Sequence, residues 1–199
     1  MRNPSACFFI GFSQYFTVPS LDMQVFLLYT VNIYRFIMGD CYMFSVGDRI
    51  VYPMHGAGII RKIEEKEILG QKRAYYILQL PGNDMNVMIP VEMDSSTGIR
   101  GVVPQQALQG VADLLRSEST QMSSNWNRRH RENMEKLRSG EILQVAEVVR
   151  NLIRADRRKN LAAGEKKLLA NAMQILISEL VLAGDMDLQE ARRFIEETV

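Results

Sequence analysis

The hydrophobic pattern of this 199-residue chain changes period near residue 104. From Phe44 up to that point, short apolar runs are separated by Gly, Pro, Asn and Asp, which is typical of strands joined by tight turns. Beyond that point, apolar residues recur every three to four positions, which is typical of amphipathic helices. A block of strands followed by a block of helices predicts an α+β chain with two domains.

The first pattern predicts a small β domain within residues 43–103. Five short strands in about 60 residues favour a closed barrel of the SH3 or Tudor type, because closure limits the exposed edges. The predicted strands are Phe44–Tyr52, Ala57–Lys66, Ala74–Leu80, Met85–Ile89 and Ile99–Val103.

The second pattern predicts an all-α helical bundle within residues 104–199. Pro104 suits the first position of a helix, because its fixed φ is already helical. Ser124 or Asn125, and further on Asp187, are residues that can cap the helices that follow them. The predicted helices are residues 104–115, Trp126–Arg138, Ile142–Arg158, Ala163–Ala183 and a last one that starts at Leu188.

Residues 1–42 differ from the rest in composition: they hold 10 of the 16 aromatic residues and only four charged residues. Residues 1–42 match the pattern of a secretory signal peptide poorly. Their best apolar run, Val25–Met38, is shorter than the roughly 20 residues of a membrane-spanning helix and contains Asn32 and Arg35. We predict that Met43 is the true start and that residues 1–42 are an atypical extension from an over-extended gene boundary. A membrane tether is the alternative.

The chemistry-bearing residues argue against an enzyme. Cys7 and Cys41 are the only cysteines and His55 and His130 the only histidines, too few for a disulfide scaffold or a four-thiolate zinc site. The segment His55–Gly58 contains a G-x-G but lacks the third glycine of a dinucleotide-binding loop. The sequence contains no P-loop, nucleophile elbow or recognisable carboxylate pair. We predict no catalytic residue, metal, cofactor or small-molecule substrate.

The charge is uneven along the chain, although the formal net charge is only +1. Residues 43–122 carry 8 basic and 9 acidic residues, residues 123–170 carry 12 and 6, and residues 171–199 carry 2 and 6. A local excess of positive charge suits the phosphates of nucleic acid. An ordinary solvated helix surface is the alternative explanation.

Trp126 is the only tryptophan, and it starts a predicted helix beside Arg128, Arg129 and Arg131. An indole in this place can anchor the core of the bundle. It can also stack on a base step while the arginines hold phosphates. The polar neighbours on both sides argue against deep burial.

Segments on both sides of residue 104 carry a family resemblance. They are Phe44–Pro53 with His55–Ala57, Asn125–Arg129, Glu135–Glu141, Val145–Leu152 and Ala163–Leu168. In this order they resemble the CarD/CdnL family of bacterial transcription regulators over about residues 43–183. The family begins near Met43, which agrees with the predicted start.

The resemblance implies a Tudor-like domain, shared with the transcription-repair coupling factor, that binds the RNA polymerase β subunit. The implied contact is strand pairing at a sheet edge. Lys66 matches a basic polymerase-contacting residue, and Ile68 lies beside it. Met88 falls where some members carry a second contacting arginine, so we expect this contact to differ in its chemistry.

The resemblance also implies that the helical domain contacts promoter DNA just upstream of the −10 element. Trp126 matches a minor-groove wedge at the upstream edge of the transcription bubble. Arg128, Arg131 and Lys166 match phosphate-contacting positions, and we add Arg129 for its charge and proximity.

The expected function is to stabilise the open promoter complex without base-specific readout, because phosphate contacts position a protein but do not specify sequence. We expect a cytoplasmic, nucleoid-associated protein with no membrane contact unless residues 1–42 are real. In the alternative interpretation, the helical domain recruits another protein and Trp126 is packed in the bundle.

Overall fold

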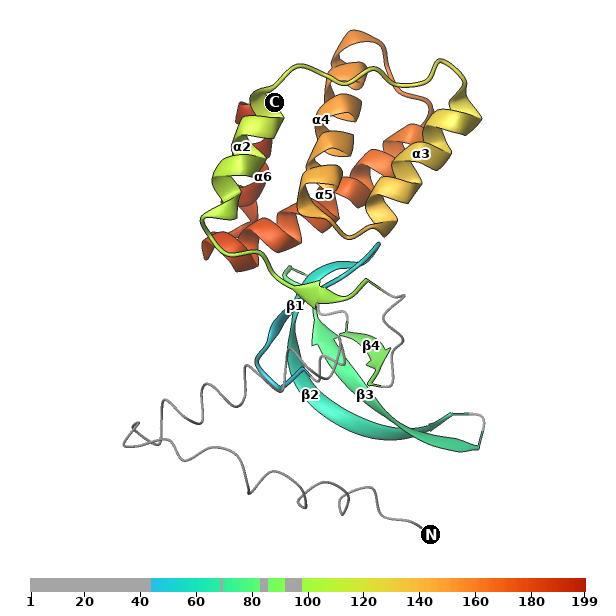
Figure 1. Cartoon of the computed structure of the whole chain (residues 1–199), viewed down its shortest axis with the longest axis vertical. Helices are drawn as coiled ribbons and strands as arrows, with labels where there is room; N and C mark the ends of the chain where they lie inside the picture. Colours follow the sequence, from blue (N-terminus) through green and yellow to red (C-terminus); the bar gives the residue numbers. More distant parts are fainter. Residues whose placement is uncertain (1–43, 69, 83–85, 92–97) are drawn as a thin grey trace, which may run out of the picture. The chain divides into compact units, whose positions relative to one another are not determined.

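A sheet precedes a set of helices in this structure, which is a computed structural model (Figure 1). The described residues are 44–68, 70–82, 86–91 and 98–199. All of them belong to one unit, Met43–Val199. The sheet and the helices occupy separate layers of this unit, which confirms the predicted α+β class. The extension predicted at residues 1–42 lies outside the described residues.

The strands form one antiparallel sheet. Their bounds are β1 (Arg49–Tyr52), β2 (Gly56–Ile68), β3 (Gln71–Gln79), β4 (Asn86–Pro90) and β5 (Arg100–Gly101). The strand order is β4-β3-β2-β1-β5, so the sheet is open among the described residues and the predicted closed barrel is not confirmed. β5 contains only two residues before the chain leaves for the helices, and among the described residues it pairs with β1 and not with β4.

The longest part of the sheet is the hairpin of β2 and β3, which turns at Gly70 with a φ of +76°. Glycine suits this turn because other residues rarely adopt a positive φ. A bulge between Ile60 and Lys62 shifts the alternation of side chains, so Ile63 pairs with Tyr76. The buried apolar cluster of the sheet contains Ile50, Ile60, Tyr76, Leu78, Leu80 and Ile89.

Five helices follow in the described part of the chain. Their bounds are α2 (Ala107–Arg116), α3 (Trp126–Arg138), α4 (Ile142–Arg158), α5 (Ala163–Gly184) and α6 (Leu188–Thr198). The predicted bounds of α3, α4 and α5 and the predicted start of α6 agree with these to within a residue. The predicted start of the first helix is wrong, because the carbonyl of Pro104 accepts the amide of Ala107 at 2.9 Å in a turn that leads into α2.

Side-chain caps fix the starts of two helices and confirm the predictions for both. At α3, Asn125 Oδ1 accepts the backbone amide of Arg128 at 3.1 Å. At α6, Asp187 and Glu190 form a capping box, in which each side chain accepts the other's backbone amide. The cap at Asn125 makes Trp126 the first residue of α3.

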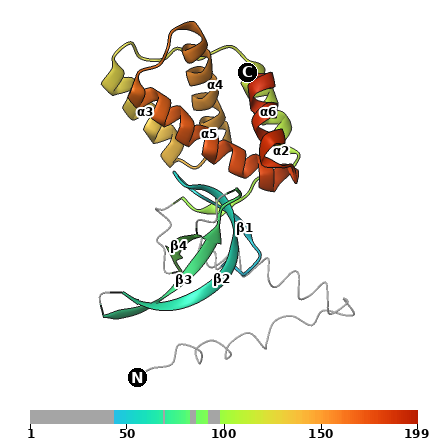
Figure 2. The same ribbon diagram turned by 180° about the vertical axis from the view of Figure 1, so that it is seen from behind.

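The central helix of the bundle is α5, which packs against α4, α6 and β2 (Figure 2). It alone among the described helices is long and apolar enough to cross a membrane by length and composition. Half of its 22 residues are buried; their apolar side chains belong to the core of the helical part, except that of Leu182, which packs with Val51 and Ala57 of the sheet. We therefore interpret α5 as a core helix.

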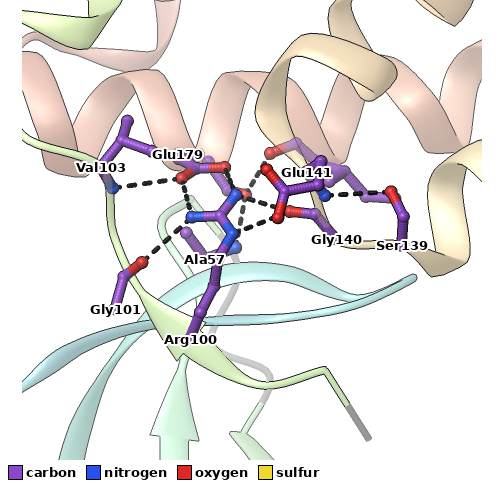
Figure 3. A network of polar contacts seen from close by, with 10 residues as sticks. Ala57, Arg100, Gly101, Val103, Ser139, Gly140, Glu141 and Glu179 are labelled. Atoms are coloured by element: carbon purple, nitrogen blue, oxygen red, sulfur yellow. Dashed lines mark hydrogen bonds and ion pairs between the residues drawn. The ribbon is translucent and has the colours of Figure 1, made fainter.

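Arg100 in β5 joins the sheet to α5 (Figure 3). Its Nη1 and Nη2 donate to the two carboxylate oxygens of Glu179 at 2.6 and 2.9 Å, and its Nε donates to the carbonyl of Gly140 at 2.9 Å. Glu179 also accepts the amide of Val103 at 3.3 Å. Because the Glu179 side chain is only 2% exposed, this bidentate pair lies largely out of water.

Two more contacts join the same end of α5 to the sheet. The hydroxyl of Ser178 accepts the backbone amide of Ala57 in β2 at 2.8 Å. Arg49 in β1 donates from Nη1 to the carbonyl of Leu182 at 2.5 Å. Three strands are thus bonded to one stretch of α5, which fixes the orientation of the helical part on the sheet.

Replacing Arg100 with alanine is expected to lower the free energy of unfolding by about 3–5 kcal/mol, because Glu179 would stay buried without a partner. Urea unfolding of the full chain measures this change. Arg116→Ala is the matched control, since Arg116 and its partner Asp113 are both exposed, and its loss should be below about 1 kcal/mol. Equal losses in the two variants would contradict the role of Arg100.

Candidate functional site

Trp126 is held on two sides and exposed on the rest of its surface. Its ring stacks on that of His130, with the ring centres 5.4 Å apart and the planes at 16°. Its edge lies against Gly164 at the start of α5, where an added Cβ would be 3.4 Å from Trp126 Cζ2. The residue is 45% exposed, so it does not have the packed position that the protein-recruiting alternative requires.

Arg129 holds the start of α3 against α5. Its Nε donates to Glu165 Oε1 at 2.8 Å, and its Nη1 donates at 2.7 Å to the carbonyl of Ser123 in the α2–α3 loop, residues 117–125. The two charged side chains are only 19% and 11% exposed. These contacts make Arg129 a positioning residue for Trp126, one helical turn away, while its predicted contact with DNA stays a prediction.

The other predicted DNA contacts are exposed side chains on α3 and α5. Two of them form ion pairs along α3, Arg128–Glu132 at 2.7 Å and Arg131–Glu135 at 3.9 Å. Exposed pairs of this kind contribute only about 0.3–0.5 kcal/mol, so a phosphate can displace the carboxylate. Lys166 is exposed and follows Gly164 by two residues, so the contact between Gly164 and Trp126 brings it to the same end of the bundle.

Arg150, in the basic segment, acts inside the protein. It is 2% exposed, and its Nη1 donates to the carbonyl of Leu114 at 3.1 Å and to the hydroxyl of Ser117 at 2.6 Å. Burial lowers the pKa of Arg150, while the nearby charge of Glu147 opposes that shift. Sequence analysis missed this role. The sequence does contain a signal for this role: Arg150 lies four residues after Ala146 and therefore on the buried face of α4.

Arg154 and Asn151 complete the attachment of the α2–α3 loop to α4. Arg154 donates to the carbonyls of Leu115 and Ser117 at 2.9 and 2.6 Å. The amide of Asn151 donates to the hydroxyl of Thr120 at 2.6 Å. The count of basic residues therefore overstates the number of guanidinium groups that are available to phosphates.

The three residues predicted to contact polymerase lie together on one face of the sheet. The strand register places Lys66, Ile68 and Met88 on the face opposite Tyr76. Lys66 Nζ donates to Met88 Sδ at 3.2 Å across the sheet. Ile68 and Met88 are 43% and 46% exposed, so this face presents apolar area beside a cation.

An open strand edge accompanies these side chains. β4 pairs with β3 only over Tyr75–Gln79, so Gln71–Arg73 have no strand on their outer side among the described residues. Lys66 and Ile68 lie directly across from this segment in the β2–β3 register. Unpaired backbone N–H and C=O groups of this kind can pair with a strand of another chain.

Comparisons with known proteins match both parts of the chain. The family model described as "CarD-like/TRCF RID domain" matches residues 44–103, and the model "CarD, C-terminal domain" matches residues 110–196. The "Putative transcription factor YdeB" of Bacillus subtilis (strain 168) is 46% identical over 138 residues, which are 69% of this chain and 90% of that protein. The chain belongs to the CarD/CdnL family.

The CarD/CdnL family consists of transcription regulators, which are generally not enzymes, and this protein is a transcription regulator of that kind. The matched RID domain is a polymerase-interacting type of domain, and it covers the sheet that carries Lys66, Ile68 and Met88. Within the described ranges, the structure places no three His, Cys, Asp or Glu side chains where they could hold a metal ion.

Glu147 is expected to make stability depend on pH. Burial raises the pKa of its carboxyl group, but hydrogen bonds from Thr120 and Lys136 outweigh this effect and hold the pKa below its ordinary value of 4.5. A lowered pKa in the folded state gives stabilisation that is present above pH 4.5 and is lost as the pH falls through the folded-state value.

Glu147→Gln should therefore lower the free energy of unfolding by about 1 kcal/mol at neutral pH, and the difference from the wild type should shrink in acid. Urea unfolding at several pH values measures it, with the exposed Glu135→Gln as control. A difference that stays constant with pH would contradict this assignment.

Proposed function

We propose that this CarD/CdnL-family protein binds the β subunit of RNA polymerase through residues 43–103 and promoter DNA upstream of the −10 element through residues 104–199. It then stabilises the open complex as a cytoplasmic, nucleoid-associated regulator. The observation that carries the proposal is the exposed indole of Trp126, backed by His130 and set among exposed cations. No bond in a substrate is made or broken.

The sheet acts as a Tudor-like module in an open form. Its unpaired segment Gln71–Arg73 suits strand pairing with the β subunit. Lys66 supplies positive charge beside that segment, and Ile68 supplies apolar area. Met88 takes the place of an arginine found in some family members, so it offers a polarisable apolar contact in place of an ion pair.

The helical part acts on the DNA through a wedge. The exposed face of Trp126 stacks on a base step that is distorted or partly open, and Arg128, Arg131 and Lys166 hold phosphates of the backbone. Stacking by one aromatic ring is worth about 1–3 kcal/mol per base. Only the difference in affinity between open and closed DNA shifts their equilibrium, and this amount corresponds to about a 5- to 150-fold change.

The helix α5 connects the two interfaces. Near one end, Glu179 bonds to Arg100 of the sheet, and near the other end Glu165 bonds to Arg129, one turn after Trp126. Docking of the sheet on polymerase therefore brings the wedge to the DNA at high local concentration and in a fixed orientation. Weak contacts to DNA then suffice for function.

Lys66→Glu is expected to weaken binding to the polymerase β subunit by about tenfold, because it places a negative charge beside the pairing edge. Biolayer interferometry with immobilised polymerase measures the affinity. Arg116→Glu is the matched control, since Arg116 is an exposed cation at the end of α2, outside the sheet and its pairing edge. Equal affinities for the two variants would contradict the assigned polymerase face.

The fluorescence of Trp126 tests the wedge directly, because this is the only tryptophan in the chain. Stacking on a base should quench the indole, so a duplex with an unpaired fork should quench it more than the fully paired duplex at equal concentration. Arg128→Ala/Arg131→Ala keeps the indole and should shift the quenching to higher DNA concentration. Equal quenching by forked and paired DNA would contradict the preference for opened DNA.

A further inference from the structure

A groove of about 670 Å³ lies beside Trp126. The α2–α3 loop forms one side, and the end of α4 with the following loop, residues 159–162, forms the other. Figures 1 and 2 both show the α2–α3 loop crossing the end of α4. Trp126 lines this groove together with Arg158 and Lys159, two residues that neither the predictions nor the comparisons assign to DNA.

The groove is strongly positive. Among the described residues, four cations line it, Arg129, Arg154, Arg158 and Lys159, and the one carboxylate is Glu165. Because Glu165 is paired with Arg129 at 2.8 Å, no carboxylate of the described lining is left to neutralise the other three cations. A cavity with this charge attracts anions, and it attracts a polyanion more strongly than a single carboxylate.

Only some of these cations can donate to a ligand. Arg129 and Arg154 donate to protein oxygens, as described above. Arg158 and Lys159 are exposed, and neither side chain makes an ion pair or hydrogen bond within the described part of the chain. Their place in and just after the last turn of α4 is favourable for cations and leaves their N–H groups available.

We infer that this groove holds the backbone of one DNA strand next to the wedge, with Arg158 and Lys159 as phosphate contacts. The inference rests on the proposed function and extends its DNA interface from α3 and α5 to the end of α4. A DNA strand fits because it offers phosphates to the two cations and flat apolar groups to Trp126. The hydroxyls of Ser119 and Ser124 line the same groove and can donate to phosphate oxygens.

The test is the salt dependence of DNA binding by the full chain. A fluorescently labelled duplex with an unpaired fork is titrated with wild type and with Arg158→Ala/Lys159→Ala, at several salt concentrations. Loss of two phosphate contacts should reduce the slope of log affinity against log salt by about 1.8. Affinity at low salt should fall by about tenfold or more.

The matched control is Arg192→Ala/Arg193→Ala, which removes two exposed cations from α6, outside the groove. An unchanged slope in Arg158→Ala/Lys159→Ala would overturn the inference, and so would an equal fall in the control, because the effect would then be one of overall charge. If the slope is unchanged but forked DNA still quenches Trp126 more than paired DNA does, the inference fails and the proposed function stands. If the wild type itself is quenched equally by forked and paired DNA, the proposed function fails.

Discussion

The bidentate ion pair between Arg100 and Glu179 holds the helical part of this molecule on its sheet. Moving a carboxylate out of water costs several kcal/mol, and here the guanidinium and the amide of Val103 compensate for that cost. The bond holds β5 on α5, while Glu165 on the same helix holds Arg129 behind the wedge. Fourteen residues separate the two glutamates, which is about 21 Å along the helix axis. One rigid element therefore connects a polymerase-binding type of sheet to an exposed indole.

Helix positions could be predicted closely, because the information that sets them is local. The 3.6-residue period and the caps at Asn125 and Asp187 define α3 and α6 within a few residues of sequence. Closure of the sheet could not be predicted, because it depends on how far β5 runs before the chain turns to the helices. The start of α2 was also misjudged, because Pro104 suits the first residue of a turn as well as that of a helix.

The site shows the same division between local and distant information. The exposure of Trp126 could be predicted from its polar neighbours, and the roles of the site residues could be predicted from the family resemblance. The partners of Arg129 and Arg150 could not be predicted, because Glu165 and Leu114 each lie 36 positions away in the chain. A charge count treats such buried guanidiniums as surface charge. The contact of Lys66 with Met88 likewise depends on a register that only the folded sheet supplies.

The central claim is that Trp126 stabilises opened promoter DNA while the sheet keeps the protein on polymerase. The most direct measurement is the lifetime of the open complex on one defined promoter after a competitor challenge, with wild type, Trp126→Ala and Trp126→Phe at concentrations that saturate polymerase. The account predicts a lifetime about 5- to 150-fold shorter for Trp126→Ala, with partial recovery in Trp126→Phe. A lifetime equal to that of the wild type in Trp126→Ala, with polymerase binding intact, would contradict it.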